Sequence, residues 1–342
     1  MRLLVTGGAG FIGSNFIRYW LSQHPRDEIV NIDLLTYAGD LASLADVERE
    51  QDDGYRFVRA DIADAVGMRE TIRAVRPAMI VNFAAETHNS RAIVDPGAFV
   101  RTNVVGTQAL LEAARHVGVE RIHHVSTCEV YGDLPLESTE AFTETSPYRP
   151  GTPYNASKAA ADLIARSYYR TYGTPVTISL SCNTYGPWQH PEKLIPLFTT
   201  NALEDRPIPI YRSSSHRREW LHVADHCRAI EAILLRGRTG EMYNVGSGDE
   251  RSVDEIADAI LLALGKPAEL KTYVSDRPAH ERRYPLDHTK ITEELGWRPA
   301  IGFARGLGST IAWYAQNRAW WGPKKLDLLD EAAWAAERGA AT

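Results

Sequence analysis

Residues 6–13 of the chain read TGGAGFIG, which places glycine at Gly7, Gly10 and Gly13 in a G-x-x-G-x-x-G pattern. A short apolar run, Leu3–Thr6, precedes this pattern, and apolar residues at helical spacing follow it over Phe11–Gln23. A glycine-rich turn between a strand and a helix lets backbone N–H groups approach a bound pyrophosphate. The pattern therefore predicts a nucleotide-binding βα unit at the start of the chain.

An acidic residue, Asp33, ends the second predicted strand, 20 residues after Gly13. A carboxylate at this place accepts hydrogen bonds from the adenosine ribose hydroxyls and repels a 2′-phosphate. A glycine-rich turn with a helix-capping aspartate is the alternative interpretation. The order of strand, glycines, helix and acid favours a dinucleotide site, and it favours NAD over NADP.

The first half of the chain alternates short apolar runs with amphipathic helical patterns. Further strands are predicted at Ile29–Ile32, Phe57–Arg59, Met79–Phe83, Ile122–Ser126 and Val176–Leu180, and helices at Thr102–His116 and 154–172. This alternation predicts an α/β fold with a Rossmann-like, doubly wound parallel sheet. Because Pro and Arg become frequent after residue 182, we expect an NAD-binding domain over 1–182, to which the chain can return later. A smaller substrate-binding lobe over 183–324 and a C-terminal tail helix over 325–342 should follow.

The composition is that of a globular protein and excludes a disordered or disulfide-scaffold chain. The 342 residues carry a net charge of −6, which argues against a nucleic-acid partner. No run approaches the ~20 apolar residues of a membrane helix, and the N-terminus lacks a signal-peptide pattern. The three cysteines are widely spaced and predict a reducing compartment. We therefore expect a cytoplasmic protein with no membrane partner and no metal site.

Residues 154–158 read YNASK, so Tyr154 and Lys158 stand at i and i+4 on one helix face. A nearby ammonium, with the positive charge of NAD, lowers a phenol pKa from its usual value of about 10. The phenolate can then take a hydroxyl proton while the same carbon gives hydride to NAD. An exposed Tyr and Lys on an ordinary helix is the alternative, but the dinucleotide motif on the same chain favours the redox pair.

Several further segments carry a family resemblance. They are LTYAG at 35–39, AAETH at 84–88, YGP at 185–187, PEKLIP at 191–196, WL at 220–221, DHCRAI at 225–230 and DRPAHERRY at 276–284. With the motifs above, the chain resembles the extended short-chain dehydrogenases/reductases over roughly residues 1–320, and among them the dTDP-glucose 4,6-dehydratases. The resemblance implies a Rossmann domain, a lobe for a nucleotide-diphosphate sugar, tightly held NAD and a homodimer.

Residues 126–132 read STCEVYG, where the resembled dehydratases read STDEVYG. In that family the Asp protonates the departing C6 oxygen and the Glu removes the C5 proton. Here Glu129 is kept and Cys128 replaces the Asp. A thiol of pKa ~8.5 holds a proton at neutral pH but is a weak hydrogen-bond donor. We expect Thr127 to bond the C4 oxygen, Glu129 to be the base and Cys128 the acid, the alternative for Cys128 being a buried space-filling side chain.

The resemblance also implies contacts with both ligands. Cofactor contacts are expected at Gly7, Gly10, Phe11, Ile12, Gly13, Asp33, Asp61, Ile62, Ala84, Tyr154 and Lys158. Arg218 with Arg277 or Arg282 is expected to hold the diphosphate, and the remaining substrate contacts are expected at Thr87, His88, Asn183, Lys193, Leu194, Asn244 and His280. The chain departs from the family where HNSR at 88–91 replaces His-Val-Asp-Arg, where YNASK replaces Tyr-Ser-Ala-Ser-Lys, and where HRREW at 216–220 replaces Asn-Val-Arg-Asp-Trp. These departures suggest a changed substrate or product.

The sequence thus predicts an NAD-dependent nucleotide-sugar dehydratase and leaves alternatives open. A 4,6-dehydratase returns the hydride to C6, whereas a 5,6-dehydratase returns it to C4 and leaves an exocyclic alkene; the tunicamycin-pathway 5,6-dehydratase also has Cys before Glu. UDP-glucuronate decarboxylases share NTYGP at 183–187 but lack the signatures at 37–39 and 277–283. A non-catalytic nucleotide-sugar-binding paralogue is disfavoured by Tyr154, Lys158 and Glu129, and Glu129 also argues against a simple 4-epimerase.

Overall fold

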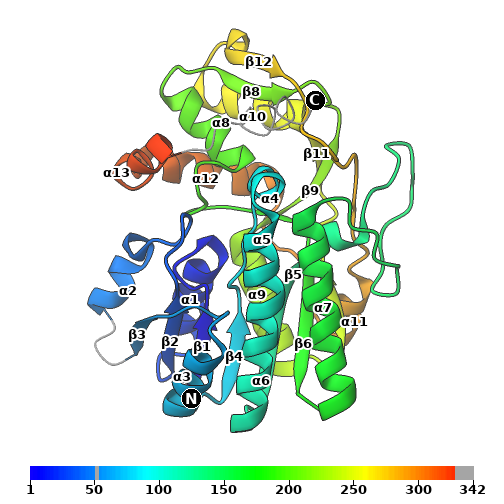
Figure 1. Ribbon diagram of the computed structural model, residues 1–342. Helices are drawn as coiled ribbons and strands as arrows, with labels where there is room; N and C mark the ends of the chain where they lie inside the picture. The colour runs from blue at the N-terminus through cyan, green and yellow to red at the C-terminus, as the bar shows by residue number, and fades with distance from the viewer. Residues whose placement is uncertain (51–53, 328–342) are drawn as a thin grey trace.

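The computed structural model describes residues 1–50 and 54–327. A parallel sheet in the order β10-β6-β5-β4-β1-β2-β3 lies at its centre (Figure 1). Its seven strands are β1 (Arg2–Thr6), β2 (Glu28–Asp33), β3 (Tyr55–Arg59), β4 (Met79–Asn82), β5 (Arg121–Thr127), β6 (Val176–Ser181) and β10 (Met242–Val245). The strand order reverses between β1 and β4, which is the switch point of a doubly wound sheet. The α/β, Rossmann-like fold expected from the sequence is confirmed.

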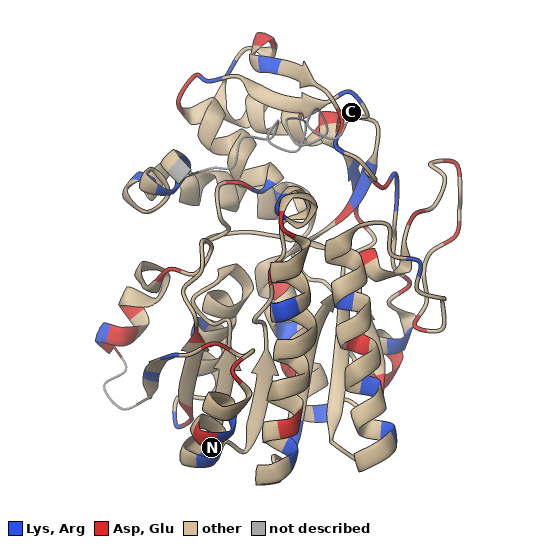
Figure 2. Cartoon of the chain, in the orientation of Figure 1, with Lys and Arg blue, Asp and Glu red and all other residues tan. Residues whose placement is uncertain are grey.

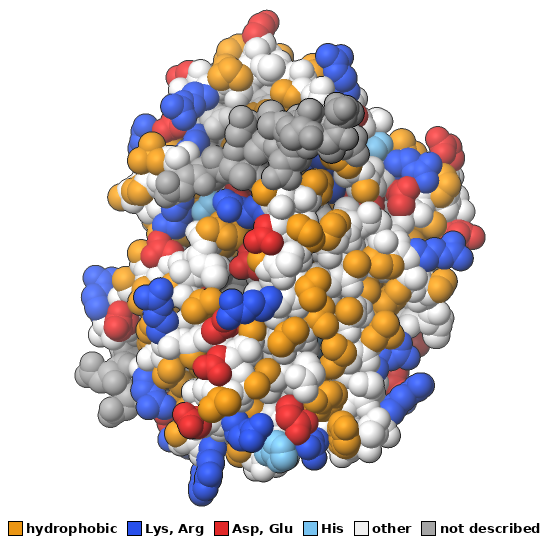
Figure 3. All heavy atoms as spheres, in the orientation of Figure 1, with side chains coloured by type: hydrophobic (Ala, Val, Ile, Leu, Met, Phe, Trp, Pro, Cys, Tyr) orange, Lys and Arg blue, Asp and Glu red, His pale blue; other side chains and the backbone are white. Residues whose placement is uncertain are grey.

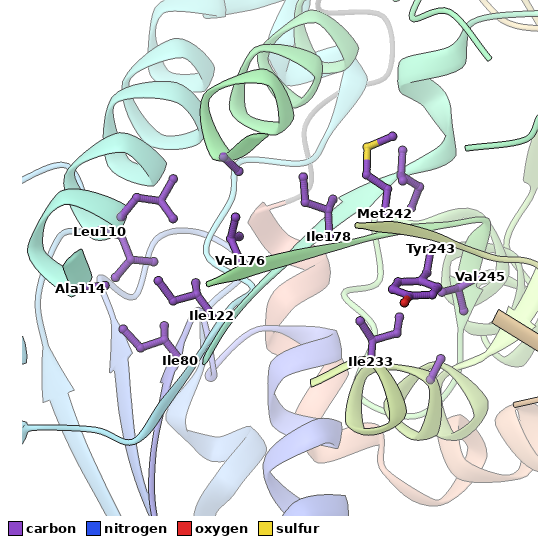
Figure 4. Close-up of a cluster of buried hydrophobic side chains, with 14 of the residues drawn as sticks. Ile80, Leu110, Ala114, Ile122, Val176, Ile178, Ile233, Met242, Tyr243 and Val245 are labelled. Carbon is purple, nitrogen blue, oxygen red and sulfur yellow. The ribbon is translucent and has the colours of Figure 1, made fainter. Parts of the chain in front are cut away.

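Helices cover both faces of this sheet. On one face lie α3 (Ala65–Val75), α6 (Thr107–Val117) and α7 (Pro153–Tyr172), and on the other α1 (Phe11–Gln23) and α9 (Val223–Arg236). Figure 4 shows Ile80, Ile122 and Val176 of neighbouring strands meeting Leu110 of α6 in the apolar layer between them. The helix predicted over Thr102–His116 begins instead as a π-helical segment, η2 (Val100–Gly106), which passes directly into α6. Shorter helices are α2 (Ala45–Glu50), α4 (Asn89–Val94), α5 (Pro96–Phe99) and α11 (Thr289–Leu295).

A smaller lobe lies above the carboxyl ends of the strands in Figure 1. It contains α8 (Leu194–Leu203), α10 (Val253–Leu264), α12 (Phe303–Gln316), the strand pair β8 (Ile208–Tyr211) and β12 (Lys271–Val274), and the sheet of β7 (Asn183–Tyr185), β9 (Arg217–His222) and β11 (Glu250–Ser252). Phe198, Ile256 and Leu307 pack in its separate apolar core. Ligands of doubly wound folds bind at the carboxyl ends of the strands, so the smaller lobe covers the expected binding site.

The chain passes between the two regions more than once. After β9 it returns to the large sheet through α9 and β10 before it continues into β11. The remaining short elements are η1 (Leu41–Leu44), η3 (Cys128–Tyr131), η4 (Ala268–Leu270), α13 (Arg318–Trp321) and η5 (Pro323–Asp327). The tail helix predicted over 325–342 lies, beyond Asp327, outside the described residues. Within the described ranges, the helices are all too short or too polar to cross a membrane.

Candidate active site

The glycine-rich turn closes tightly between β1 and α1. Gly7 has a φ of +70°, and a Cβ there would lie 2.5 Å from the backbone nitrogen of Ala84. A Cβ on Gly13 would lie 2.3 Å from the carbonyl oxygen of Gly7. Gly10 is the N-cap of α1 and supplies no side chain to cap its first N–H groups. The turn therefore presents a helix N-terminus that suits an anionic pyrophosphate.

Asp33 stands at the end of β2 beside this turn. Its carboxylate accepts hydrogen bonds from the backbone N–H of Ala9 at 2.9 Å and of Leu35 at 2.8 Å. Burial raises the pKa of Asp33, and these two hydrogen bonds oppose the rise. Asp33 and the three glycines line one cavity of about 310 Å³, which also contains Phe11, Ile12, Asp61, Ile62 and Ala84. The structure thus brings every predicted cofactor residue to a single cavity.

Helix α7 carries the Tyr–Lys pair into the same cavity. Thr152 is its N-cap, and the Thr152 hydroxyl accepts a hydrogen bond from the backbone N–H of Asn155; Pro153 occupies its first turn. Tyr154 follows at once, and Lys158 lies one turn further on. Both side chains are buried and line the cavity. The N-cap and the proline of the first turn therefore fix where α7 begins, and with it the position of Tyr154 and Lys158 in the cavity.

The charge state of this pair depends mainly on burial. Lys158 Nζ donates to the carbonyl oxygen of Val125 at 2.8 Å, and burial lowers the pKa of Lys158 to about 8. Burial, followed by the charge of Glu129, raises the pKa of Tyr154 well above its usual value. Desolvation of the phenol and the nearby carboxylate cause this rise, and the lowering expected from Lys158 together with the positive charge of NAD stays a prediction.

Glu129 lies on η3, directly after the carboxyl end of β5. Asn89 Nδ2 donates to its carboxylate at 3.0 Å. Burial is the largest cause of a raised pKa at Glu129, and the charge of Glu281 is the second. Glu129 lines the cofactor cavity and also a second cavity of about 220 Å³, under the smaller lobe. A carboxyl group with a raised pKa, able to act as a general base, therefore lies where the two cavities meet.

The second cavity gathers the predicted substrate residues. It shares Thr87, Asn183 and Lys193 with the first cavity and adds His88, Leu194, Arg218, Arg277 and His280. Figure 2 shows basic residues on β9 and β11, where the chain rises into the smaller lobe. Burial lowers the pKa of His88 to about 3 and of His280 to about 2, so both imidazoles are neutral hydrogen-bonding groups at pH 7. The cationic groups of this cavity are arginine and lysine side chains, which suit a diphosphate.

Three side chains that the sequence analysis named, Cys128, Asn244 and Arg282, line neither cavity, and Arg282 pairs with Asp133 at 2.7 Å. Cys128 is 1% exposed and packs in the apolar core, and burial raises its thiol pKa well above the usual value. Asn244 lies on β10, where its amide accepts from Tyr131 Oη at 2.9 Å and donates to the carbonyl oxygen of Phe142 at 2.8 Å. The expectation that Asn244 contacts the ligand is corrected, because both ends of its amide bond groups of the core.

The structure adds residues that the sequence left without a role. Tyr284 lines the second cavity, donates to Asn183 Oδ1 at 3.1 Å and lies beneath the Arg218 guanidinium. Asn89 lines it as well and holds Glu129. Tyr284 belongs to DRPAHERRY, a segment that carries the family resemblance, and Asn89 belongs to HNSR, a segment that departs from it; those two segments were the available signals.

Comparisons with known proteins agree with this geometry. A family model described as GDP-mannose 4,6 dehydratase matches residues 4–310. The chain belongs to this family. A dTDP-glucose 4,6-dehydratase of Streptomyces niveus is 48% identical over 329 residues, covering 95% of this chain and 96% of that protein. The resemblance to extended short-chain dehydrogenases/reductases is confirmed.

Solved structures of related family members share the fold. A dTDP-glucose 4,6-dehydratase of Streptomyces venezuelae, crystallised with NAD and TYD, is 49% identical with a TM-score of 0.90, covering 95% of this chain and 100% of that one. A UDP-glucose 4-epimerase of Thermus thermophilus, in complex with NAD, is 31% identical with a TM-score of 0.85, covering 93% of this chain and 100% of that one. The architecture thus serves dehydratases and epimerases alike, and the choice between them rests on the site.

Proposed function

We propose that the chain is an NAD-dependent nucleotide-sugar dehydratase, a hydro-lyase of the dTDP-glucose 4,6-dehydratase type. The observation that carries the proposal is the place of Glu129, which lines both the cofactor cavity and the arginine-lined cavity. An epimerase needs no carboxylate base at the sugar, whereas a dehydratase must remove a proton from C5. Membership of a family that includes dTDP-glucose 4,6-dehydratases supports the same choice.

The cofactor cavity fits NAD by its own chemistry. The tight turn at Gly7 and Gly13 leaves room for a pyrophosphate against the first turn of α1, and the Asp33 carboxylate suits ribose hydroxyls. When bound there, NAD supplies the hydride acceptor for oxidation at C4 and the hydride donor at the end of the cycle. The chain itself excludes water from this chemistry, since Tyr154 and Lys158 are buried.

Four side chains of the cofactor cavity act in the proposed reaction, and two of them, Tyr154 and Glu129, take protons. Tyr154 takes the proton of the C4 hydroxyl, with Thr127 bonding the C4 oxygen and Lys158 stabilising the phenolate. The ketone that forms at C4 acidifies the C5 hydrogen, and the Glu129 carboxylate removes it. The C6 hydroxyl then leaves as water and needs one proton. Cys128 as the donor of that proton stays a prediction from the sequence motif.

The second cavity is proposed to hold the diphosphate and sugar. Arg218 is 6% exposed and donates to the carbonyl oxygens of Glu281 at 2.6 Å and Arg282 at 3.2 Å, which fixes its guanidinium at the cavity wall. Arg277 lines the same wall, and Lys193 Nζ bonds the carbonyl oxygen of Thr87 at 3.3 Å. Guanidinium groups held in this way are ready to bind phosphate oxygens in pairs.

A homodimer is part of the proposal. Apolar side chains gather over α6 and α7 in Figure 3, and exposed apolar residues of η2 and α7 include Val105, Leu163 and Tyr172, at 47%, 55% and 55% exposure. Apolar patches of this kind mark protein–protein contacts. The cytoplasmic location stays a prediction that rests on the three free, buried cysteines.

The proposal is tested by incubating the purified protein with NAD and, separately, dTDP-glucose, UDP-glucose, UDP-N-acetylglucosamine and UDP-glucuronate. Mass spectrometry and proton NMR then follow the sugar. We expect loss of one water and a new methyl doublet, the signature of a 4-keto-6-deoxy product. Alkene protons without a methyl would identify 5,6-dehydration, and loss of carbon dioxide would identify a decarboxylase. No change with any of the sugars would contradict the proposed function for these substrates.

A further inference from the structure

A buried aspartate, Asp162, stands on α7 one turn after Lys158 and two turns after Tyr154. Residues four apart on a helix lie on one face, so these three side chains form a row along α7. Asp162 is 0% exposed and lines neither cavity. A buried carboxyl group is costly unless its neighbours bond it, so the partners of Asp162 indicate what it does.

Asp162 contacts β5 on both sides of a single residue. The Ser126 hydroxyl donates to Asp162 Oδ2 at 2.8 Å, and His124 Nε2 lies 3.4 Å from Asp162 Oδ1. Side chains alternate along a strand, so His124 and Ser126 face α7 together with Val125 between them. The carbonyl oxygen of Val125 is the group that accepts from Lys158 Nζ at 2.8 Å. The segment of β5 that holds Lys158 is therefore itself held by Asp162.

A chain of buried polar groups extends this contact to the glycine-rich turn. The Thr6 hydroxyl donates to Asn82 Oδ1 at 2.6 Å, and Asn82 Nδ2 lies 3.1 Å from His124 Nδ1. Burial lowers the pKa of His124, so its imidazole is neutral at pH 7. Because its Nδ1 accepts from the Asn82 amide, the imidazole carries its proton on Nε2, toward Asp162. Thr6 ends β1 directly before Gly7, so the chain joins the turn of the cofactor cavity to α7.

The charged and titratable groups around Asp162 come from several elements. They are His124 of β5, Tyr131 of η3, Tyr148 of the segment before α7, and Tyr154, Lys158 and Arg166 of α7. Lys158 is the buried cation of this group, whereas Arg166 is half-buried. Burial lowers the pKa of Lys158, and the charge of Asp162 opposes this lowering. Asp162 therefore favours the ammonium form of Lys158, which a phenolate at Tyr154 requires.

We propose that Asp162 is a positioning residue for the redox pair, which clamps β5 to α7 on both sides of Val125 and so holds the carbonyl that fixes the Lys158 ammonium in the cavity. This inference rests on the proposed dehydratase function, in which Lys158 stabilises the Tyr154 phenolate during oxidation at C4. Asp162 lines neither cavity and acts through Lys158. Its loss should therefore slow the oxidation at C4 and leave ligand binding largely unchanged.

The first test compares Ser126→Ala with Tyr148→Phe. Each variant removes one hydroxyl that donates to Asp162 Oδ2, at 2.8 Å from Ser126 and 3.1 Å from Tyr148, but only Ser126 belongs to β5. Both are made in Glu129→Gln, where the reaction should stop after oxidation at C4 and NADH absorbance gives the rate. We expect Ser126→Ala to lower this rate about tenfold, with the half-saturating sugar concentration changed less than about twofold. Tyr148→Phe should stay within about twofold of its parent in both quantities.

Equal rates of C4 oxidation in Ser126→Ala and Tyr148→Phe would overturn the clamp. A defect of Ser126→Ala confined to the affinity for sugar or NAD would overturn it as well, because Ser126 would then act as a ligand contact. Either result is obtained with a protein that still oxidises the sugar, so the dehydratase function would stand.

A second measurement does not depend on turnover. In protein labelled with ¹³C at the lysine Cε, the resonance that disappears in Lys158→Met reports Lys158. We expect it to titrate below the usual lysine range in the wild type, and at a pH lower by about one unit or more in Asp162→Asn. The matched control is Asp225→Asn. Asp225 is equally buried and accepts from the backbone N–H groups of Ala300 and Ile301, but it lines neither cavity, so its loss should leave the Lys158 titration unchanged.

Circular dichroism establishes that each variant is folded before it is titrated. A Lys158 resonance that titrates at the same pH in folded Asp162→Asn and in the wild type would refute the inference, even if none of the tested sugars were a substrate. The comparison of Ser126→Ala with Tyr148→Phe leaves Asp162 in place, so it tests the clamp even if Asp162→Asn does not fold.

Discussion

Replacing Asn89 by leucine removes the amide that donates to Glu129 Oε2 at 3.0 Å, while the side chain keeps its approximate size. A hydrogen bond to a charged group contributes ~1.5–3 kcal/mol, and one pKa unit corresponds to ~1.4 kcal/mol. Because the amide stabilises the carboxylate and not the acid, its loss should raise the pKa of Glu129 by about one to two units. Glu129 must be ionised to remove the C5 proton, so the acid limb of kcat/KM should move to higher pH. At pH values below the acid limb of the wild type, kcat/KM of the variant should be about 10- to 100-fold lower than that of the wild type.

The assay is water loss, followed by mass spectrometry across the pH range in both proteins. Thr152→Ala is the control, because it removes the α7 cap and the 2.7 Å bond to Asn89 but leaves Asn89 facing Glu129. It should cost about 1 kcal/mol of unfolding free energy with a smaller movement of the limb. An acid limb that stays in place or moves to lower pH in Asn89→Leu would refute the assignment of Asn89 as the group that stabilises the ionised base.

Three further predictions concern the cofactor, the thiol and the dimer. Asp33→Ala should weaken NAD binding about tenfold or more in calorimetry, because the carboxylate both bonds the backbone N–H of Ala9 and faces the cavity; unchanged affinity would contradict this role. Cys128→Ala should release water within about threefold of the wild-type rate, because the thiol lines neither cavity; a loss of ~100-fold confined to the water-loss step would reinstate the thiol as the acid. If the chain forms the proposed homodimer through α7, Leu163→Glu should lower its mass in light scattering, whereas Val66→Glu, on an exposed residue of α3, should not. Equal masses for both variants would count against this surface.

The parts of the site that follow local rules were predictable from the sequence. A glycine turn between β1 and α1 and an acid at the end of β2 define where a dinucleotide lies, since both are fixed by neighbours in the chain. The spacing of Tyr154 and Lys158 on one helix likewise needed only helical geometry. These residues all line one cavity in the structure.

The remaining parts depend on contacts distant in sequence. Glu281 lies 126 positions after Asn155, and no periodicity relates the two; the segment after β12 brings the Glu281 carboxylate to the Asn155 amide at the N-terminus of α7. Cys128 was expected in the cavity from its place in the motif, but η3 turns its side chain into the core. Asn244 was placed near the ligand by the family resemblance, and only the structure shows that its amide on β10 bonds Tyr131 and Phe142 in the core.

The most direct test of the dehydratase chemistry is deuterium at C5 of the sugar after reaction in heavy water. With wild-type protein, NAD and dTDP-glucose, we expect a product that has lost one water and carries one deuterium at C5, because Glu129 removes the original proton. Glu129→Gln should oxidise C4 but incorporate no deuterium and release no water. Deuterium at C5 at the wild-type rate in Glu129→Gln, or a wild-type product that retains its original C5 hydrogen, would contradict Glu129 as the base.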